Sequence, residues 1–217
     1  MTRPRPALPR KPGRPLAADA DHRTRILDTT LAQFVSEGIA AVTLRGIAKQ
    51  SGVTPALVSY YFGSKEQLVT TVIEERVLPV FAEAVAMLGN APPADLIAGF
   101  VAGVGAMVQR HPWLPGLWVR EILMEGGTLR ELIIERMAPQ LPRMLAARFT
   151  ELQRTGDLNP DLDPRLLVVS LMGLTLFAHA ARPVWTRIFA ADDVGTEQMQ
   201  RHTLALLSRG LELKHEN

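Results

Sequence analysis

The segment that follows Gly52 carries side chains suited to the surface of DNA. Its spacing predicts a short helix in which Val53 and Val58 point inward, so that the opposite side of the helix is exposed. The exposed positions hold small or hydroxyl-bearing residues, namely Pro55, Ala56, Ser59 and Tyr60. A helix that lies in the major groove requires such residues at its surface. The pattern therefore indicates a recognition helix, although paired helices of this kind also occur in proteins that never bind nucleic acid.

Capping signals define the two helices that present this surface. Thr43 can accept a hydrogen bond from the free N–H groups of a first turn, which predicts a helix that starts there and ends at Gly52 after two turns. Thr54 repeats the signal, and Pro55 occupies the first helical position, where its missing N–H costs nothing. Two short helices joined by a turn form a helix-turn-helix.

Flanking helices are expected on both sides of this pair. Apolar residues at helical spacing predict a first helix over residues 21–37. Ser64 and Gln67 have the spacing of a capping box, which predicts a fourth helix that continues past a kink near Pro79 to about Leu88.

The same region resembles the TetR family of transcriptional regulators. The resemblance covers about 45 residues, from the first helix to the start of the fourth. It is carried by three runs of residues: Val42-Thr43-Leu44-Arg45-Gly46-Ile47-Ala48, then Gly52-Val53-Thr54, then Tyr60-Tyr61-Phe62-Gly63-Ser64-Lys65-Glu66-Gln67-Leu68.

The resemblance implies a DNA-binding role for each matching residue, and it implies a repressor that a small-molecule effector releases from a palindromic operator. Arg45 can offer a bidentate fork to guanine, or it can reach the backbone. Partial burial against the first helix is the alternative for the two tyrosines. By this resemblance Thr43 and Lys65 contact phosphates, and Arg45 contacts a guanine edge or the backbone. Bases are contacted by Pro55, Ala56 and Ser59, with Thr54 beside them. The DNA backbone is contacted by Tyr60 and Tyr61.

Basic charge is concentrated at the start of the chain. Residues 1–65 carry a net charge of +6, whereas the remainder carries −4. The proline-rich stretch over residues 1–20 is expected to be a flexible arm, in which Arg10, Lys11 and Arg14 are predicted to enter an A·T-rich minor groove. The alternative is a tail whose charge is incidental.

The rest of the chain is predicted to be helical, which gives an all-α fold of three parts. These are the arm (1–20), a helix-turn-helix DNA-binding domain (21–68) and a larger helical domain for effector binding and dimerisation (69–217). Helices of the larger domain are expected near residues 93–110, 115–125, 128–154, 164–181 and 196–213, with Arg182-Pro183 among the separators.

Two of these helices suit an intermolecular four-helix bundle. A twofold dimer built on them would set two recognition helices about 34 to 36 Å apart, as a palindromic operator requires. The apolar residues involved are Leu166, Leu167, Val169, Leu171, Leu174 and Phe177 on one helix, and Met199, Leu204, Leu207 and Leu211 on the other.

An effector pocket is expected among aromatic and methionine side chains, because these can line adaptable apolar cavities. Ordinary core packing is the alternative for each of them. Arg120, Glu121 and Glu125 can face either solvent or a polar group of the ligand, and we favour solvent. The pocket candidates are Phe100, Met107, Trp113, Trp118, Met124 and Phe177.

Several classes of protein are disfavoured. The chain has no cysteine, and its five histidines show no metal-ligand spacing, so no metal site, catalytic residue or cofactor is expected. No stretch reaches the length of a membrane span, and a cytoplasmic location is expected. The alternatives to a regulator are a non-specific architectural DNA-binding protein and, with less support, an all-helical enzyme.

Overall fold

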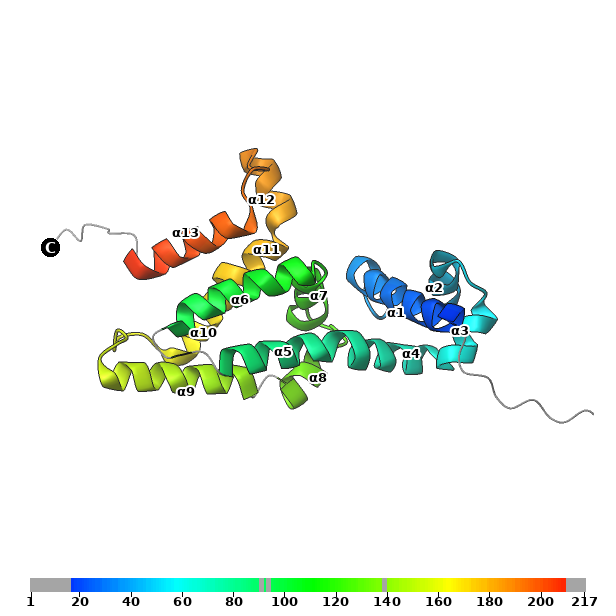
Figure 1. The fold of residues 1–217 in the computed structure, drawn as a ribbon, viewed down its shortest axis with the longest axis horizontal. Helices are drawn as coiled ribbons and strands as arrows, with labels where there is room; N and C mark the ends of the chain where they lie inside the picture. The colour runs from blue at the N-terminus through cyan, green and yellow to red at the C-terminus, as the bar shows by residue number, and fades with distance from the viewer. Residues whose placement is uncertain (1–16, 90–91, 93–94, 138–139, 210–217) are drawn as a thin grey trace, which may run out of the picture.

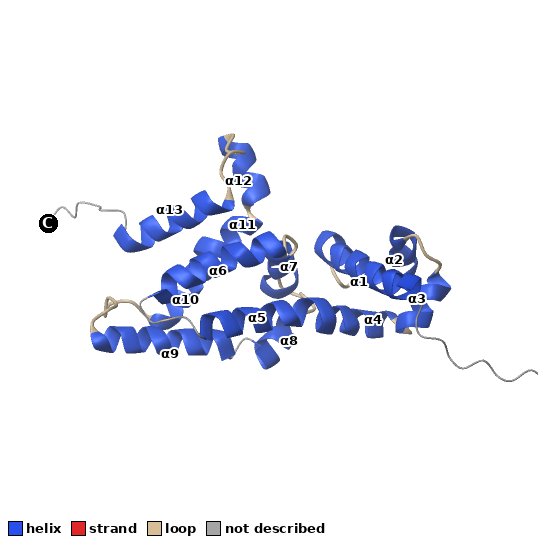
Figure 2. Ribbon diagram, viewed as in Figure 1, coloured by secondary structure: helices blue, strands red, loops and turns tan. Residues whose placement is uncertain are grey.

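The computed structural model describes residues 17–209 apart from 90–91, 93–94 and 138–139, and every regular element in that part is a helix (Figures 1 and 2). The predicted all-α fold with an N-terminal helix-turn-helix is confirmed. In chain order, with η marking π-helical turns, the elements are α1 (Ala17–Glu37), α2 (Leu44–Ser51), α3 (Pro55–Phe62), α4 (Lys65–Val72), η1 (Ile73–Val77), α5 (Leu78–Gly89), α6 (Leu96–Arg110), α7 (Leu114–Trp118), η3 (Val119–Leu123), α8 (Arg130–Leu132), η4 (Ile133–Met137), α9 (Gln140–Thr155), α10 (Pro164–Met172), η5 (Gly173–Phe177), α11 (Ala178–Ala180), α12 (Arg182–Phe189) and α13 (Thr196–Arg209).

Helices α1 to α4, which we call the head, share one apolar cluster with buried residues of the segment from α7 to η4, namely Leu117, Ile122, Leu129 and Ile133. Helix α1 begins at Ala17, four residues before the predicted start, and buries Ile26, Leu27 and Phe34 completely. Helices α2 and α3 contribute further buried residues to the same cluster, including Ile47 and Val58. The short helices of the head therefore depend on α1 for most of their packing, since two-turn helices are marginal on their own.

A continuous rod of α4, η1 and α5 leads from the head along the rest of the molecule (Figure 1). Pro79 explains why the rod contains a π turn, because its nitrogen has no hydrogen to give to the carbonyl of Glu75. The Leu78 N–H instead bonds the Ile73 carbonyl five residues back, and Arg76 Nη1 donates to the Glu75 carbonyl oxygen at 3.3 Å. The predicted kink is thus a π turn within a continuous helix.

Two ion pairs hold this turn against α1. Arg23 donates to both carboxylate oxygens of Glu75, at 2.8 and 2.6 Å, and Arg76 Nε donates to Asp28 at 2.8 Å. The hydrogen bonds from Arg23 lower the pKa of Glu75. Both pairs are partly exposed, so they orient the rod more than they stabilise it.

Helices α5 to α13 enclose a second apolar cluster, and we call them the body. Helix α6 lies against α5 and α13, and α9 packs on α10. The predicted helix over 128–154 is wrong as a single element, because α8 and η4 end at Met137 and α9 starts anew at Gln140.

A helix does end beside Arg182-Pro183, at Ala180 of α11, but a further helix that the sequence did not predict, α12, begins at Arg182. Pro183 lies in the first turn of this helix, where proline is tolerated. Trp185 Nε1 donates to the Ala178 carbonyl at 2.9 Å and Arg182 donates to the Val194 carbonyl at 2.9 Å, which fixes α12 at a bend of 71° from the helices before it. Within the described ranges no single helix has both the length and the apolar character needed to cross a bilayer.

Candidate nucleic-acid interface

Side-chain caps fix the helix-turn-helix at both of its helix starts. Thr43 Oγ1 accepts the Gly46 N–H at 3.1 Å, and Thr54 Oγ1 accepts the Leu57 N–H at 3.2 Å. Gly52 ends α2 in a left-handed conformation (φ 64°, ψ 36°), which glycine adopts without steric cost. The predicted caps and turn are confirmed, and together they restrict the orientation of α3 relative to α2.

The outer face of α3 is open, as its spacing indicated. Val58 is fully buried, whereas Pro55, Ala56 and Ser59 are exposed together with Thr54. None of these side chains is longer than that of threonine apart from the ring of Pro55. The α3 backbone can therefore approach a flat surface closely along its first two turns.

The two tyrosines of the chain lie side by side but differ in exposure. Tyr60 is 80% exposed, while Tyr61 is half-buried and packs against the cluster of the head. Their ring centroids are 5.3 Å apart in an edge-to-face arrangement. The accessible side chain of Tyr60 suits a phosphate contact. Tyr61 packs against the head, so a contact with the DNA backbone would have to come from the exposed part of its ring.

Lys65 lies at the start of α4, where Ser64 and Gln67 form the predicted capping box. The Ser64 N–H donates to Gln67 Oε1 at 2.9 Å, and the Gln67 N–H donates to Ser64 Oγ at 3.3 Å. The ammonium of Lys65 donates to the Ala40 carbonyl at 2.8 Å, across to the loop before α2. A phosphate contact by Lys65 must therefore share its ammonium with this carbonyl.

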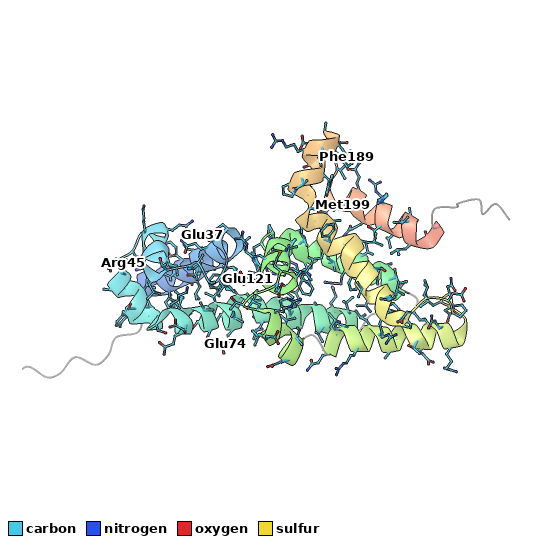
Figure 3. All side chains as sticks on the ribbon, turned by 180° about the vertical axis from the view of Figure 1, so that it is seen from behind. Glu37, Arg45, Glu74, Glu121, Phe189 and Met199 are labelled. Atoms are coloured by element: carbon cyan, nitrogen blue, oxygen red, sulfur yellow. The ribbon has the colours of Figure 1, made fainter. Side chains whose placement is uncertain are left out.

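Arg45 projects from the first turn of α2 at the outer end of the head (Figure 3). Lys49 is exposed one turn later on the same helix, and sequence reasoning did not single it out. The sequence could have identified Lys49 as a second basic residue beside Arg45, because positions 45 and 49 share a helix face. The two cations and the exposed face of α3 form what we call the reading surface.

The arm residues Arg10, Lys11 and Arg14 lie outside the described residues. Five of the ten basic residues within positions 1–65 belong to residues 1–16, so the described head is close to electrically balanced. Much of the predicted attraction for a polyanion therefore depends on the arm.

The candidate pocket residues do not converge on one cavity. Phe100 and Met107 are buried in the cluster of the body, and Trp113 and Trp118 are half-buried between the two clusters. Met124 and Phe177 are 59% and 60% exposed. The effector site thus stays a prediction.

The hollows among the described residues include a small inner one and a wider cleft. The inner one of about 10 Å³, the size of one water molecule, lies between α6, η5 and α13, beside His179 and Gln200. The wider cleft of about 480 Å³ lies where the head meets the body, and Met124 is the one pocket candidate that lines it.

The head meets the body at the C-terminal end of α1. Gly116 of α7 lies so close to Val35 that a Cβ atom there would be 3.2 Å from Val35 Cγ1. Glu121 lies at this junction and is buried, so the expectation that it faces solvent is wrong.

Comparisons of the sequence with known proteins agree with this arrangement. Residues 26–72 match the family model described as "Bacterial regulatory proteins, tetR family". The HTH-type transcriptional regulator BetI of Rhizobium meliloti (strain 1021) is 36% identical over 80 residues, which are 36% of this chain and 39% of the relative. The regulatory protein RaaS of Mycobacterium tuberculosis (strain ATCC 25618 / H37Rv) is 29% identical over 69% of this chain and 65% of its own length. These matches span less than two thirds of either relative.

Solved structures resemble the whole fold. A crystal structure of the transcriptional regulator FadR from Bacillus subtilis in complex with stearoyl-CoA aligns with a TM-score of 0.63 and 19% identity over 88% of this chain and 100% of that one. A TetR/AcrR-family regulator from Thermobifida fusca YX-ER1 aligns with a TM-score of 0.59 and 20% identity, over 89% of this chain and 100% of that one.

Proposed function

We propose that the chain, whose residues 26–72 match the TetR family model, is a sequence-specific DNA-binding transcription regulator of that family. It acts as a repressor in the cytoplasm and leaves its operator when a small molecule binds the body. We propose no catalytic role for it.

One observation carries the DNA-binding proposal. The reading surface combines an open, small-residue face on α3 with Arg45 and Lys49 on α2, behind a turn that Thr43, Gly52 and Thr54 hold in place. Small side chains let the helix enter a major groove, and an arginine can discriminate guanine there. A helix pair that served only for packing would have no need to leave this face uncovered.

Dimerisation is supported by an apolar stripe on the outside of the body. Leu166, Val169, Gly173 and Phe177 recur at spacings of three and four residues along α10 and η5, and all four are exposed. The stripe lies opposite the buried Leu167 and Leu171, which separates the predicted dimer residues of α10 and η5 into an inner and an outer set. Of the predicted residues on the last helix, Leu211 lies outside the described residues. A second copy is the proposed occupant, and a twofold pair predicts a palindromic operator.

The effector is proposed to act on the region between the two apolar clusters, where Trp113 and Trp118 contact both. Fatty-acyl compounds are the first class to screen, because the FadR neighbour was crystallised with stearoyl-CoA. A ligand that binds two body conformations unequally shifts their populations, and operator affinity falls with that shift.

Selection of bound DNA from a random duplex library by the full chain tests the function. We expect a palindromic consensus. The Arg45→Ala variant should bind the selected duplex about 5-fold to 150-fold more weakly, which corresponds to roughly 1–3 kcal/mol. Arg187→Ala, which removes the same charge from exposed α12 at a distance from the reading surface, is the matched control (Figure 1). Recovery of random sequences would instead support the architectural alternative.

The arm has its own test. Removal of residues 1–16 deletes five basic residues, and each phosphate contact adds about 0.9 to the slope of log affinity against log salt. We expect the slope to decrease by about 2 to 4. An unchanged slope would mean that the charge of the arm is incidental.

A further inference from the structure

A buried carboxylate bridges the head and the body. Glu121 belongs to η3 and is only 3% exposed. Its Oε1 accepts the backbone N–H of Ile39, in the loop between α1 and α2, at 3.0 Å. Its Oε2 accepts the backbone N–H of Thr128, in the turn after η3, at 3.0 Å. The two donors belong to segments 89 residues apart in the sequence, and one side chain joins them.

Glu121 lies between the apolar cluster of the head and the wider cleft, whose lining includes it. Ile39, Leu117, Ile122 and Leu129 are all buried in the same cluster as the core of the head. A carboxylate in such a place is tolerated because charge-assisted hydrogen bonds replace its water shell. Loss of the Ile39 bond would leave two buried polar groups without partners, which is costly, whereas the bond from the exposed Thr128 is only partly buried.

Close packing of glycines lets both segments approach Glu121. A Cβ at Gly127 would be 2.3 Å from the Glu121 carbonyl oxygen, so only glycine allows that turn to close on η3. On the other side, Gly38 has a φ of 90° and its Cβ position is 3.3 Å from Glu121 Oε1. Residues without side chains thus flank the carboxylate on the head side and on the body side.

The loop that Glu121 holds leads directly to the reading surface. Residues 38–41 connect α1 to Thr43, which caps α2. Within this loop the Ala41 N–H bonds the Gly38 carbonyl at 3.2 Å, and the Lys65 ammonium bonds the Ala40 carbonyl at 2.8 Å. The loop is therefore held by the body through Ile39 and by α4 through Ala40, and its position sets that of α2.

We propose that Glu121 is the positioning residue that couples the loop over residues 38–41 to η3, at a junction where the head and the body also share an apolar cluster and where Arg120 Nη1 donates to the Val35 carbonyl oxygen at 3.3 Å. A body conformation that moves η3 must either draw the loop over 38–41 with it or leave a buried carboxylate and a buried N–H unpartnered. Movement of the body thereby reorients α2 and α3. The consequence for DNA rests on the proposed function, but the bridge itself can be tested without DNA.

The chain supplies natural probes for each part. Its two tyrosines, Tyr60 and Tyr61, lie in the head, and its three tryptophans, Trp113, Trp118 and Trp185, lie in the body. Trp113 and Trp118 also contact the cluster of the head, so both are replaced by phenylalanine for this measurement. Thermal unfolding of that full-length background can be followed for the head by tyrosine absorbance and for the body by the fluorescence of Trp185. With Glu121 in place we expect the two transitions to coincide.

The decisive variants are Glu121→Ala and the isosteric Glu121→Gln, with Glu125→Gln as the matched control. Glu125 is exposed and lines the same cleft, so its variant removes one charge from the junction without touching the bridge. We expect the tyrosine midpoint of Glu121→Ala to fall below its tryptophan midpoint by about 4 to 8 °C, which is about 2–4 °C for each lost hydrogen bond. Glu121→Gln keeps one acceptor oxygen and should show about half of this separation.

Hydrogen exchange at the Ile39 amide provides the second readout. We expect exchange to become roughly tenfold faster in Glu121→Ala and to stay unchanged in Glu125→Gln. If the tyrosine and tryptophan midpoints fall together, or if Ile39 exchange does not change, Glu121 merely stabilises the body and the proposal is overturned. If Glu121→Ala does not fold, the separation and the exchange rate in Glu121→Gln decide. A failure to select an operator would leave this result intact.

Discussion

Gly63 should be the position in the head least tolerant of alanine. It follows α3 with φ 72° and ψ −109°, a conformation that residues with a side chain rarely adopt. Backbone strain of this kind costs about 1–3 kcal/mol. A Cβ atom there would also lie 2.1 Å from Gln67 Oε1, the acceptor of the Ser64 N–H in the capping box. Loss of that box adds about 0.5–2 kcal/mol. The free energy of unfolding of Gly63→Ala should therefore be lower by about 2–4 kcal/mol.

Two other glycines isolate the backbone contribution. Gly52 and Gly156 also have positive φ, 64° and 82°, but nothing lies within 4 Å of their Cβ positions. Alanine at either should cost only about 1–2 kcal/mol. Urea unfolding monitored by far-UV circular dichroism measures all three variants. In a Gln67→Ala background the cost of Gly63→Ala should drop toward that of Gly52→Ala. Equal costs for Gly63→Ala and Gly52→Ala in the native background would refute the reasoning.

Three further predictions concern pH and assembly. Hydrogen bonds from Arg23 lower the pKa of Glu75, so they stabilise the fold at neutral pH and this stabilisation is lost as pH falls below about 4.3. The free energy of unfolding should therefore decrease less on acidification in Glu75→Gln than in the native chain, by a difference of less than about 1 kcal/mol. Burial, and then the charge of Arg182, lowers the pKa of His179, so the unfolded chain binds its proton more readily. Stability should therefore decrease from pH 7.5 to 5.5, and less steeply in His179→Gln when melting temperatures are compared. Val169→Glu places a charge on the 65%-exposed stripe residue and should convert the dimer to monomer in sedimentation experiments.

Each of these has a clear contrary result. Identical midpoints of acid unfolding for Glu75→Gln and the native chain would mean that solvent screens the pair with Arg23 so strongly that the pair adds no measurable stability. Equal pH slopes with and without His179 would assign the slope to other histidines. A Val169→Glu chain that still sediments as a dimer would place the interface on another face.

The predictable features of this fold are those encoded within a few consecutive residues. Thr43, Thr54 and the pair Ser64 and Gln67 each cap a helix through bonds that span three residues, so their sequence spacing was sufficient. The exposed face of α3 followed for the same reason, since one buried valine fixes the orientation of a two-turn helix.

Features that depend on partners distant in the chain could not be predicted from short-range sequence spacing. Glu121 is buried because the Ile39 amide, 82 residues earlier in the chain, comes to meet it. Pro183 has the sequence signal of a helix end, yet it lies in the first turn of α12, whose position depends on the bond from Trp185 to Ala178. Aromatic and methionine residues were grouped as a pocket by type alone, although Phe177 lies on the outer stripe and Phe100 lies in the core.

The central claim is that the reading surface recognises one DNA sequence. The most direct measurement titrates the full chain, at 0.15 M salt, with the selected duplex and with a duplex of the same composition in permuted order. The account predicts a ratio of affinities of about 10³ or more, because specific regulators exceed their own non-specific binding by at least that factor. It also predicts two chains for each selected duplex. A ratio below about 10 would contradict sequence-specific recognition.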